Sequence, residues 1–218
     1  MDAGAVKDQE GTRGVLKYAL LELLSDRPLT GYELTKRFSA SIVTFWHAKH
    51  TQIYRELKRM QAEGLVTSRR EIQEGRPNKH VYSMTPVGKE ALVRWLRTRP
   101  GLQAVKDDML LRVFAFGHLP PDDAIAQIRQ HGEQHAERLR SLREIEQRRL
   151  ERYGPPEDRA RVNYDLYCRY LTLYHAIRYE EMYVEWCRWA AEALAARGGE
   201  GPMQDGAGPY TGRDYAHL

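Results

Sequence analysis

The chain has 218 residues, 42% of them hydrophobic, which is enough to bury a core and excludes a disordered chain. Its net charge is only +4, but residues 1–100 hold 18 basic and 11 acidic residues, a net charge of +7, whereas residues 101–218 hold 16 basic and 19 acidic residues, a net charge of −3. No stretch approaches the roughly 20 apolar residues of a membrane span, and the start lacks the apolar run of a secretory signal, so we expect a cytoplasmic protein that does not contact a membrane.

Two short helices are predicted at the beginning of the chain. Apolar residues at three-and-four spacing indicate the first helix near residues 15–24. Thr30 and Glu33 have the spacing of a capping box, which predicts that the second helix starts there. The apolar residues expected on the buried face of this second helix are Tyr32, Leu34 and Phe38.

A third helix, a strand pair and a fourth helix follow. The third helix is predicted from residue 48 or 49 to Glu63, where Gly64 ends it. Strand patterns at 65–72 and 80–85 flank a turn-rich basic segment. Thr85 and Pro86 then mark the start of the fourth helix. Its expected apolar side consists of Ala91, Leu92, Trp95 and Leu96.

The second half of the chain has almost only helix patterns. Helices are predicted near residues 106–116, from Pro121 to a break at 153–156, and from about Asp158 to Arg197. Cys168 and Cys187 lie on the last of these, about 28 Å apart at 1.5 Å per residue, so they cannot pair within one chain. We expect a flexible N-terminus at 1–13, a first domain at 14–100, a helical domain at 101–197 and a disordered tail at 198–218.

The order of three helices and a two-stranded hairpin, with a net positive charge, is that of a winged helix-turn-helix. The third helix has one apolar face, formed by Ile53, Leu57 and Met60, and one polar face that suits the major groove of DNA. On the polar face Thr51, Gln52 and Arg55 are the candidates for reading bases. The candidates for phosphate contacts are Lys49, His50 and Lys58 on this helix and Arg76 and Lys79 at the hairpin tip. Successive strand residues point to opposite faces, so at most one of Arg69 and Arg70 faces the DNA.

The helical half contains residue types that suit metal or ligand binding. His131 and His135 are four residues apart, as metal ligands on a helix would be, but without an obvious third ligand a solvated pair is the favoured interpretation. The aromatic residues of the last helix indicate a core, a dimer interface or a pocket for a flat ligand, with Tyr170, Tyr174, Trp186 and Trp189 as the candidates. We find no catalytic triad order, phosphate-binding glycine loop or paired carboxylates, and expect neither an enzyme nor a cofactor or metal.

The motifs of the N-terminal half closely resemble those of the PadR family of bacterial transcriptional regulators, over about residues 14–96. They are Leu16-Lys17-Tyr18-Ala19-Leu20-Leu21-Glu22-Leu23-Leu24, Thr30-Gly31-Tyr32-Glu33-Leu34, Ile53-Tyr54-Arg55-Glu56-Leu57, Glu63-Gly64-Leu65-Val66, Gly75-Arg76-Pro77-Asn78-Lys79 and Tyr82-Ser83-Met84-Thr85-Pro86-Val87-Gly88-Lys89. The second half is similar, more loosely, to the longer members of that family, through residues 106–111 and 189–194.

The resemblance implies a mainly α protein, a winged helix-turn-helix followed by an α-helical dimerisation domain. It also implies that Tyr54, Arg76, Lys79 and Tyr82 lie at or near the DNA, and that an aromatic compound can act as effector. We therefore expect a homodimeric, sequence-specific DNA-binding regulator, a repressor, that binds an inverted repeat of double-stranded DNA. The alternative is a winged helix that serves protein association without specific DNA binding, although the polar, cationic outer face of the third helix suits phosphates better than a dry protein interface.

Overall fold

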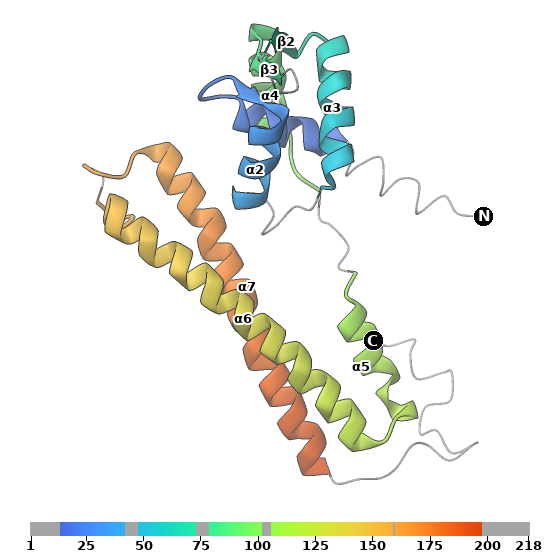
Figure 1. Cartoon of the computed structure of the whole chain (residues 1–218). Helices are drawn as coiled ribbons and strands as arrows, with labels where there is room; N and C mark the ends of the chain where they lie inside the picture. Colours follow the sequence, from blue (N-terminus) through green and yellow to red (C-terminus); the bar gives the residue numbers. More distant parts are fainter. Residues whose placement is uncertain (1–13, 42–47, 73–78, 102–105, 159, 198–218) are drawn as a thin grey trace, which may run out of the picture. The chain divides into compact units, whose positions relative to one another are not determined.

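The computed structural model describes residues 14–41, 48–72, 79–101, 106–158 and 160–197, and the statements below refer to these ranges. By its internal contacts the chain divides into two compact units, residues 1–102 and residues 103–218. We call the first the winged unit and the second the helical unit, and describe each separately (Figure 1).

The winged unit contains the predicted helices and strands and one further strand. Residues 14–23 form a helix. The elements after it are β1 (Leu29–Thr30), α2 (Gly31–Ser41), α3 (His50–Ala62), β2 (Val66–Glu71), β3 (Lys79–Met84) and α4 (Pro86–Leu96). The sheet is antiparallel with the order β1-β3-β2. Its first strand was not predicted, because two residues that pair only with β3 leave no alternating pattern in the sequence.

Local hydrogen bonds confirm the predicted helix ends. The backbone N–H of Glu33 donates to Thr30 Oγ1 at 3.1 Å, and the N–H of Thr30 donates to Glu33 Oε2 at 2.8 Å, which completes the capping box. Gly64, which follows α3, has a φ of 70°. The N–H of Leu65 donates to the carbonyl of Met60 at 2.9 Å, as in a Schellman motif. Thr85 Oγ1 accepts from the N–H of Gly88 at 3.0 Å at the start of α4.

The core of the winged unit gathers apolar residues from all of its helices. Its fully buried members include Leu20, Leu21, Leu29, Leu34, Phe38, Ile53, Leu57 and Met60. Two predictions of burial were wrong, since Tyr32 is 70% and Leu96 65% exposed. Tyr32 lies two residues from Leu34, about 200° around the helix, and Leu96 is the last residue of α4, one turn beyond the buried Leu92.

The helical unit consists of α5 (Asp108–Ala115), a short 3₁₀ helix (Phe116–His118), α6 (Pro121–Tyr153) and α7 (Tyr164–Arg197). The two long helices run antiparallel, side by side (Figure 1). They lie in close contact where Gly132 faces Cys187, since a Cβ added to Gly132 would lie 2.9 Å from the Cβ of Cys187. Both cysteines are free thiols on α7. Among the described residues, no helix is apolar over a stretch long enough to cross a membrane.

The start of the last helix differs from the prediction. It begins at Tyr164 and not near Asp158. The side chain of Asn163 accepts the N–H of Leu166 at 2.9 Å, so this asparagine caps the helix and the preceding residues form turns. The expected flexible N-terminus and the expected tail from Gly198 lie outside the described residues.

Candidate nucleic-acid interface

Helix α3 has one buried face and one exposed face, as its sequence pattern predicts. Ile53, Leu57 and Met60 are at most 1% exposed and anchor the helix in the core. The exposed residues include all of the candidates for base and phosphate contacts on this helix except Tyr54. They are Lys49, His50, Thr51, Gln52, Arg55 and Lys58.

The cations on the exposed face are available to an anionic partner. Within the described ranges, no ion pair engages Lys49, Arg55 or Lys58. The neighbouring Arg59 differs, because its Nε lies 2.7 Å from Glu63 Oε1. The face therefore offers three unpaired positive charges, as a phosphate-binding surface requires.

Gln52 also has a structural role at the beginning of α3. Its Oε1 accepts the backbone N–H of Lys49 at 2.7 Å, which satisfies a donor that the helix itself cannot pair. Reading adenine with both polar atoms of this glutamine would require Oε1 to accept a second hydrogen bond while it keeps the one from Lys49. In this arrangement the amide nitrogen of Gln52 remains available as a donor to a base edge.

Two tyrosines, Tyr54 on α3 and Tyr82 on β3, are near enough for one to influence the pKa of the other. Tyr54 is half-buried on α3, and its ring centroid lies 4.7 Å from that of His50. Tyr82 on β3 is only 6% exposed; burial, and then the neighbouring Tyr54, raise the pKa of its phenol, against a hydrogen bond with Ser68 that lowers it. Of the two, Tyr54 has more of its surface accessible to DNA.

The two strands β2 and β3, which form the wing, both carry charged residues. Lys79 is exposed at the first residue of β3, paired in register with Glu71. Arg69 Nη2 lies 2.8 Å from Glu71 Oε1, so this arginine is already paired on the wing. Arg76, the remaining wing candidate, lies outside the described residues.

Sequence reasoning missed a buried carboxyl group on α3. Glu56 is 8% exposed, and no described group hydrogen-bonds to its Oε1. Burial raises the pKa of this carboxyl above its usual range, against the opposing effect of Arg59. The only signal in the sequence was its position three residues after Ile53 and one before Leu57, on the edge of the apolar face.

The aromatic candidates of α7 differ in their surroundings. The ring centroids of Tyr170 and Tyr174 lie 6.2 Å apart. Trp186 packs against the core formed by α5, α6 and α7, whereas Trp189 is 63% exposed. A pocket of about 480 Å³ between α5, α6 and α7 is lined by two other tyrosines of α7, Tyr179 and Tyr183.

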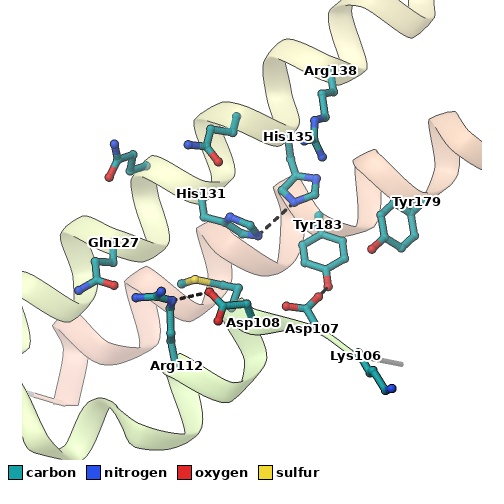
Figure 2. Close-up of a pocket in the computed structure, with 13 residues that line it drawn as sticks. Lys106, Asp107, Asp108, Arg112, Gln127, His131, His135, Arg138, Tyr179 and Tyr183 are labelled. Atoms are coloured by element: carbon teal, nitrogen blue, oxygen red, sulfur yellow. Dashed lines mark hydrogen bonds and ion pairs between the residues drawn. The ribbon is translucent and has the colours of Figure 1, made fainter. Parts of the chain in front are cut away.

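That pocket is lined by both histidines of the pair, which differs from the predicted solvated pair because His135 is buried and His131 is half-buried. His135 is 5% exposed; its Nε2 lies 3.1 Å from Nε2 of His131, and its Nδ1 is hydrogen-bonded to Glu180 on α7. The ring of Tyr183 stacks on His135 at 4.3 Å, and its hydroxyl donates to Asp107 (Figure 2). Burial, and then the neighbouring His135, lower the pKa of His131. The prediction failed because Glu180 is 45 residues away in the sequence.

Over the ranges that the structure describes, no group of three or more histidine, cysteine, aspartate and glutamate side chains is arranged to hold a metal ion. Hydrogen bonds join His131 and His135 of α6 to Glu180 of α7. Tyr183 stacks on His135 and donates to Asp107, whose other carboxylate oxygen accepts the N–H of Leu110 at 3.0 Å and so caps α5.

Two family models match the chain. The model of the "Transcriptional regulator PadR-like family" matches residues 20–94, and that of "Virulence activator alpha C-term" matches residues 105–195. Among curated proteins, the negative transcriptional regulator PadR of Bacillus subtilis is 34% identical over 173 residues, which cover 79% of this chain and 93% of that protein.

Solved structures of that relative have the same fold. The structure of B. subtilis PadR in complex with operator DNA is 31% identical with a TM-score of 0.72, and the match covers 83% of this chain and 97% of that one. The structure of B. subtilis PadR in complex with p-coumaric acid is 29% identical with a TM-score of 0.69, over 84% and 97% of the two chains. The protein therefore belongs to the PadR-like family of transcriptional regulators.

Proposed function

We propose that this regulator is a repressor that binds an inverted-repeat operator as a homodimer and is released by a small aromatic effector. The observation that carries the DNA-binding part is the exposed face of α3, where Lys49, Arg55 and Lys58 have no carboxylate partner among the described residues. Thr51 and Arg55 supply base contacts, and the lysines, His50 and the wing supply phosphate contacts. The B. subtilis relative, solved with operator DNA, supports the proposal.

The homodimer is supported by exposed apolar surface on the helical unit. On α5, Leu111 is 67% and Phe114 74% exposed, and on α7 Trp189 is 63% exposed. Side chains of this size are costly to leave in water, and interfaces between subunits are rich in aromatic residues. A two-fold axis through such an interface presents two copies of α3 to an inverted repeat.

The effector proposal rests on the p-coumaric acid bound to the relative. A phenolic acid added to the operator complex of this protein should release the DNA, whereas an aliphatic acid of similar size should not. Persistence of the complex at millimolar concentrations of a panel of phenolic acids would refute this part alone.

The experiment that tests DNA binding is a footprint on the region upstream of the protein's own gene, followed by anisotropy titrations of the protected site. Affinity should fall steeply with salt, with a slope of about −0.9 for each phosphate neutralised. Arg55→Ala should weaken specific binding by about 1–3 kcal/mol, whereas Arg94→Ala, an exposed arginine on α4, serves as the matched control. Binding that is insensitive to salt, or equal losses in both variants, would favour the alternative of a protein-association module.

A further inference from the structure

The ring of Tyr54 lies directly against the backbone of Gly31. A Cβ added at position 31 would be 2.6 Å from Cε1, 2.8 Å from Cζ and 2.9 Å from the hydroxyl oxygen of Tyr54, and real Cβ atoms essentially never come within 3.0 Å of such neighbours. All three atoms belong to the hydroxyl end of the ring. Any side chain at position 31 therefore displaces the part of Tyr54 that would form a hydrogen bond.

The backbone conformation of Gly31 does not itself require glycine. Among the described residues, only Gly64 and Gly154 have a positive φ, and Gly31 is the first residue of α2. Alanine is the better helix former, so local propensity favours a side chain here. What position 31 requires is the absence of a side chain, because the Tyr54 ring occupies the space where a Cβ would lie.

The backbone at position 31 cannot move aside easily. Thr30 pairs with Val81 of β3 and is held by both hydrogen bonds of its capping box with Glu33. On the other side, Thr35 Oγ1 donates to the carbonyl of Gly31 at 2.9 Å. Because the start of α2 is fixed to the sheet in this way, the ring of Tyr54 has to give way.

The opposite side of Tyr54 is fixed as well. Ile53, the preceding residue, is 1% exposed and holds this part of α3 in the core, and the ring of His50 lies 4.7 Å from that of Tyr54. We propose that Gly31 is a positioning residue, which acts on operator affinity by seating the Tyr54 ring against the start of α2. This inference rests on the proposed function, in which Tyr54 contacts DNA; Gly31 is buried and need not touch the DNA itself.

The test is a double-mutant cycle in the full chain, measured by anisotropy with the labelled operator. Gly31→Ala and Tyr54→Ala should each lower the affinity by roughly tenfold, as expected for loss of one DNA contact. Added to Tyr54→Ala, Gly31→Ala should cost less than about twofold, because the ring that it displaces is gone. Gly14→Ala is the matched control, since Gly14 is also at the start of a helix and a Cβ there would meet nothing within 4 Å.

A second measurement separates seating from general damage. In protein labelled with fluorotyrosine, the ¹⁹F resonance that disappears in Tyr54→Ala should shift in Gly31→Ala and stay in place in Gly14→Ala. Thermal unfolding of the same variants should show that the loss of affinity in Gly31→Ala is not explained by unfolded protein.

Three outcomes would overturn the inference. The first is an equal loss of affinity from Gly31→Ala in both backgrounds, which would mean that the added methyl acts on the DNA or the fold directly. The second is an unchanged affinity in Gly31→Ala while Tyr54→Ala binds weakly, and the third is an unshifted Tyr54 resonance. Absence of specific binding by the unaltered chain would instead refute the proposed function, and with it the role in DNA binding of the contact between Gly31 and the Tyr54 ring.

Discussion

Replacing Glu56 by glutamine should stabilise the winged unit at neutral pH. The carboxyl group is 8% exposed on the inward side of α3, and its Oε1 has no hydrogen-bond partner among the described residues. An ionised group in this position loses its hydration without full compensation. Glutamine has the same shape and removes the charge.

The magnitude follows from two opposing effects. A buried polar group without a partner costs about 1–3 kcal/mol, and more when it is charged. Arg59, Lys17 and Arg55 partly offset this cost, although burial remains the largest influence on the pKa of Glu56. We therefore expect a gain of about 1 kcal/mol, which corresponds to a rise in Tm of about 4–8 °C for a domain of this size.

The effect should depend on pH with a definite sign. Because the pKa of Glu56 is raised in the folded state above its ordinary value of 4.5, the folded protein keeps this proton to a higher pH than the unfolded chain. Stability of the unaltered protein is thus lost as the pH rises above about 4.5 and through the folded pKa, and the advantage of Glu56→Gln should grow over that window.

Thermal unfolding followed by circular dichroism between pH 4 and 8 is the assay. Glu90→Gln removes a charge from the exposed surface of α4 in the same unit and controls for the change in net charge. A difference between Glu56→Gln and the unaltered protein that does not increase with pH, or a lower stability of Glu56→Gln at pH 7, would refute the reasoning.

Two further predictions concern the helical unit. Gly132→Val should destabilise it by about 1–3 kcal/mol in urea unfolding, because even a Cβ at position 132 would lie 2.9 Å from the Cβ of Cys187. Gly101→Ala, where a Cβ meets nothing within 4 Å, is the control and should be neutral. Equal effects of the two substitutions would contradict the close approach of Gly132 to Cys187. The pKa of His131 is lowered in the folded state, so its contribution to stability should be present above about pH 6.5 and be lost as the pH falls below that value. In His131→Gln the decrease in Tm between pH 7.5 and 5.5 should therefore be smaller than in the unaltered protein, and identical pH profiles would count against a lowered pKa of His131.

Features with a local cause could be predicted from the sequence. The capping box of Thr30 and Glu33, the glycine that ends α3 and the threonine cap of α4 all depend on residues within one turn of each other. The division of α3 into a buried and an exposed face follows equally from its period. Asn163 is a further local signal, because its side chain caps α7 and so fixes where that helix starts.

Features that depend on contacts between distant segments could not be predicted. The burial of His135 depends on Glu180 of α7, and β1 exists only because Leu29 and Thr30 pair with β3. The contact between Gly31 and the Tyr54 ring also joins distant segments, because nothing near Gly31 in the sequence shows which ring will cover it. One sequence provides the residue types for these contacts but not the geometry that joins them.

The separation of the two faces of α3 has a consequence for the evolution of such regulators. Thr51, Arg55 and Lys58 are exposed and bear none of the core packing, which rests on Ile53, Leu57 and Met60. Under the proposed function, duplicated genes can therefore exchange these exposed residues, and so acquire new operators, without loss of the core that folds the unit. Gln52 is the exception, because a substitution there also removes the cap of its own helix, so the variety of residues tolerated at this position should be narrower than at its neighbours.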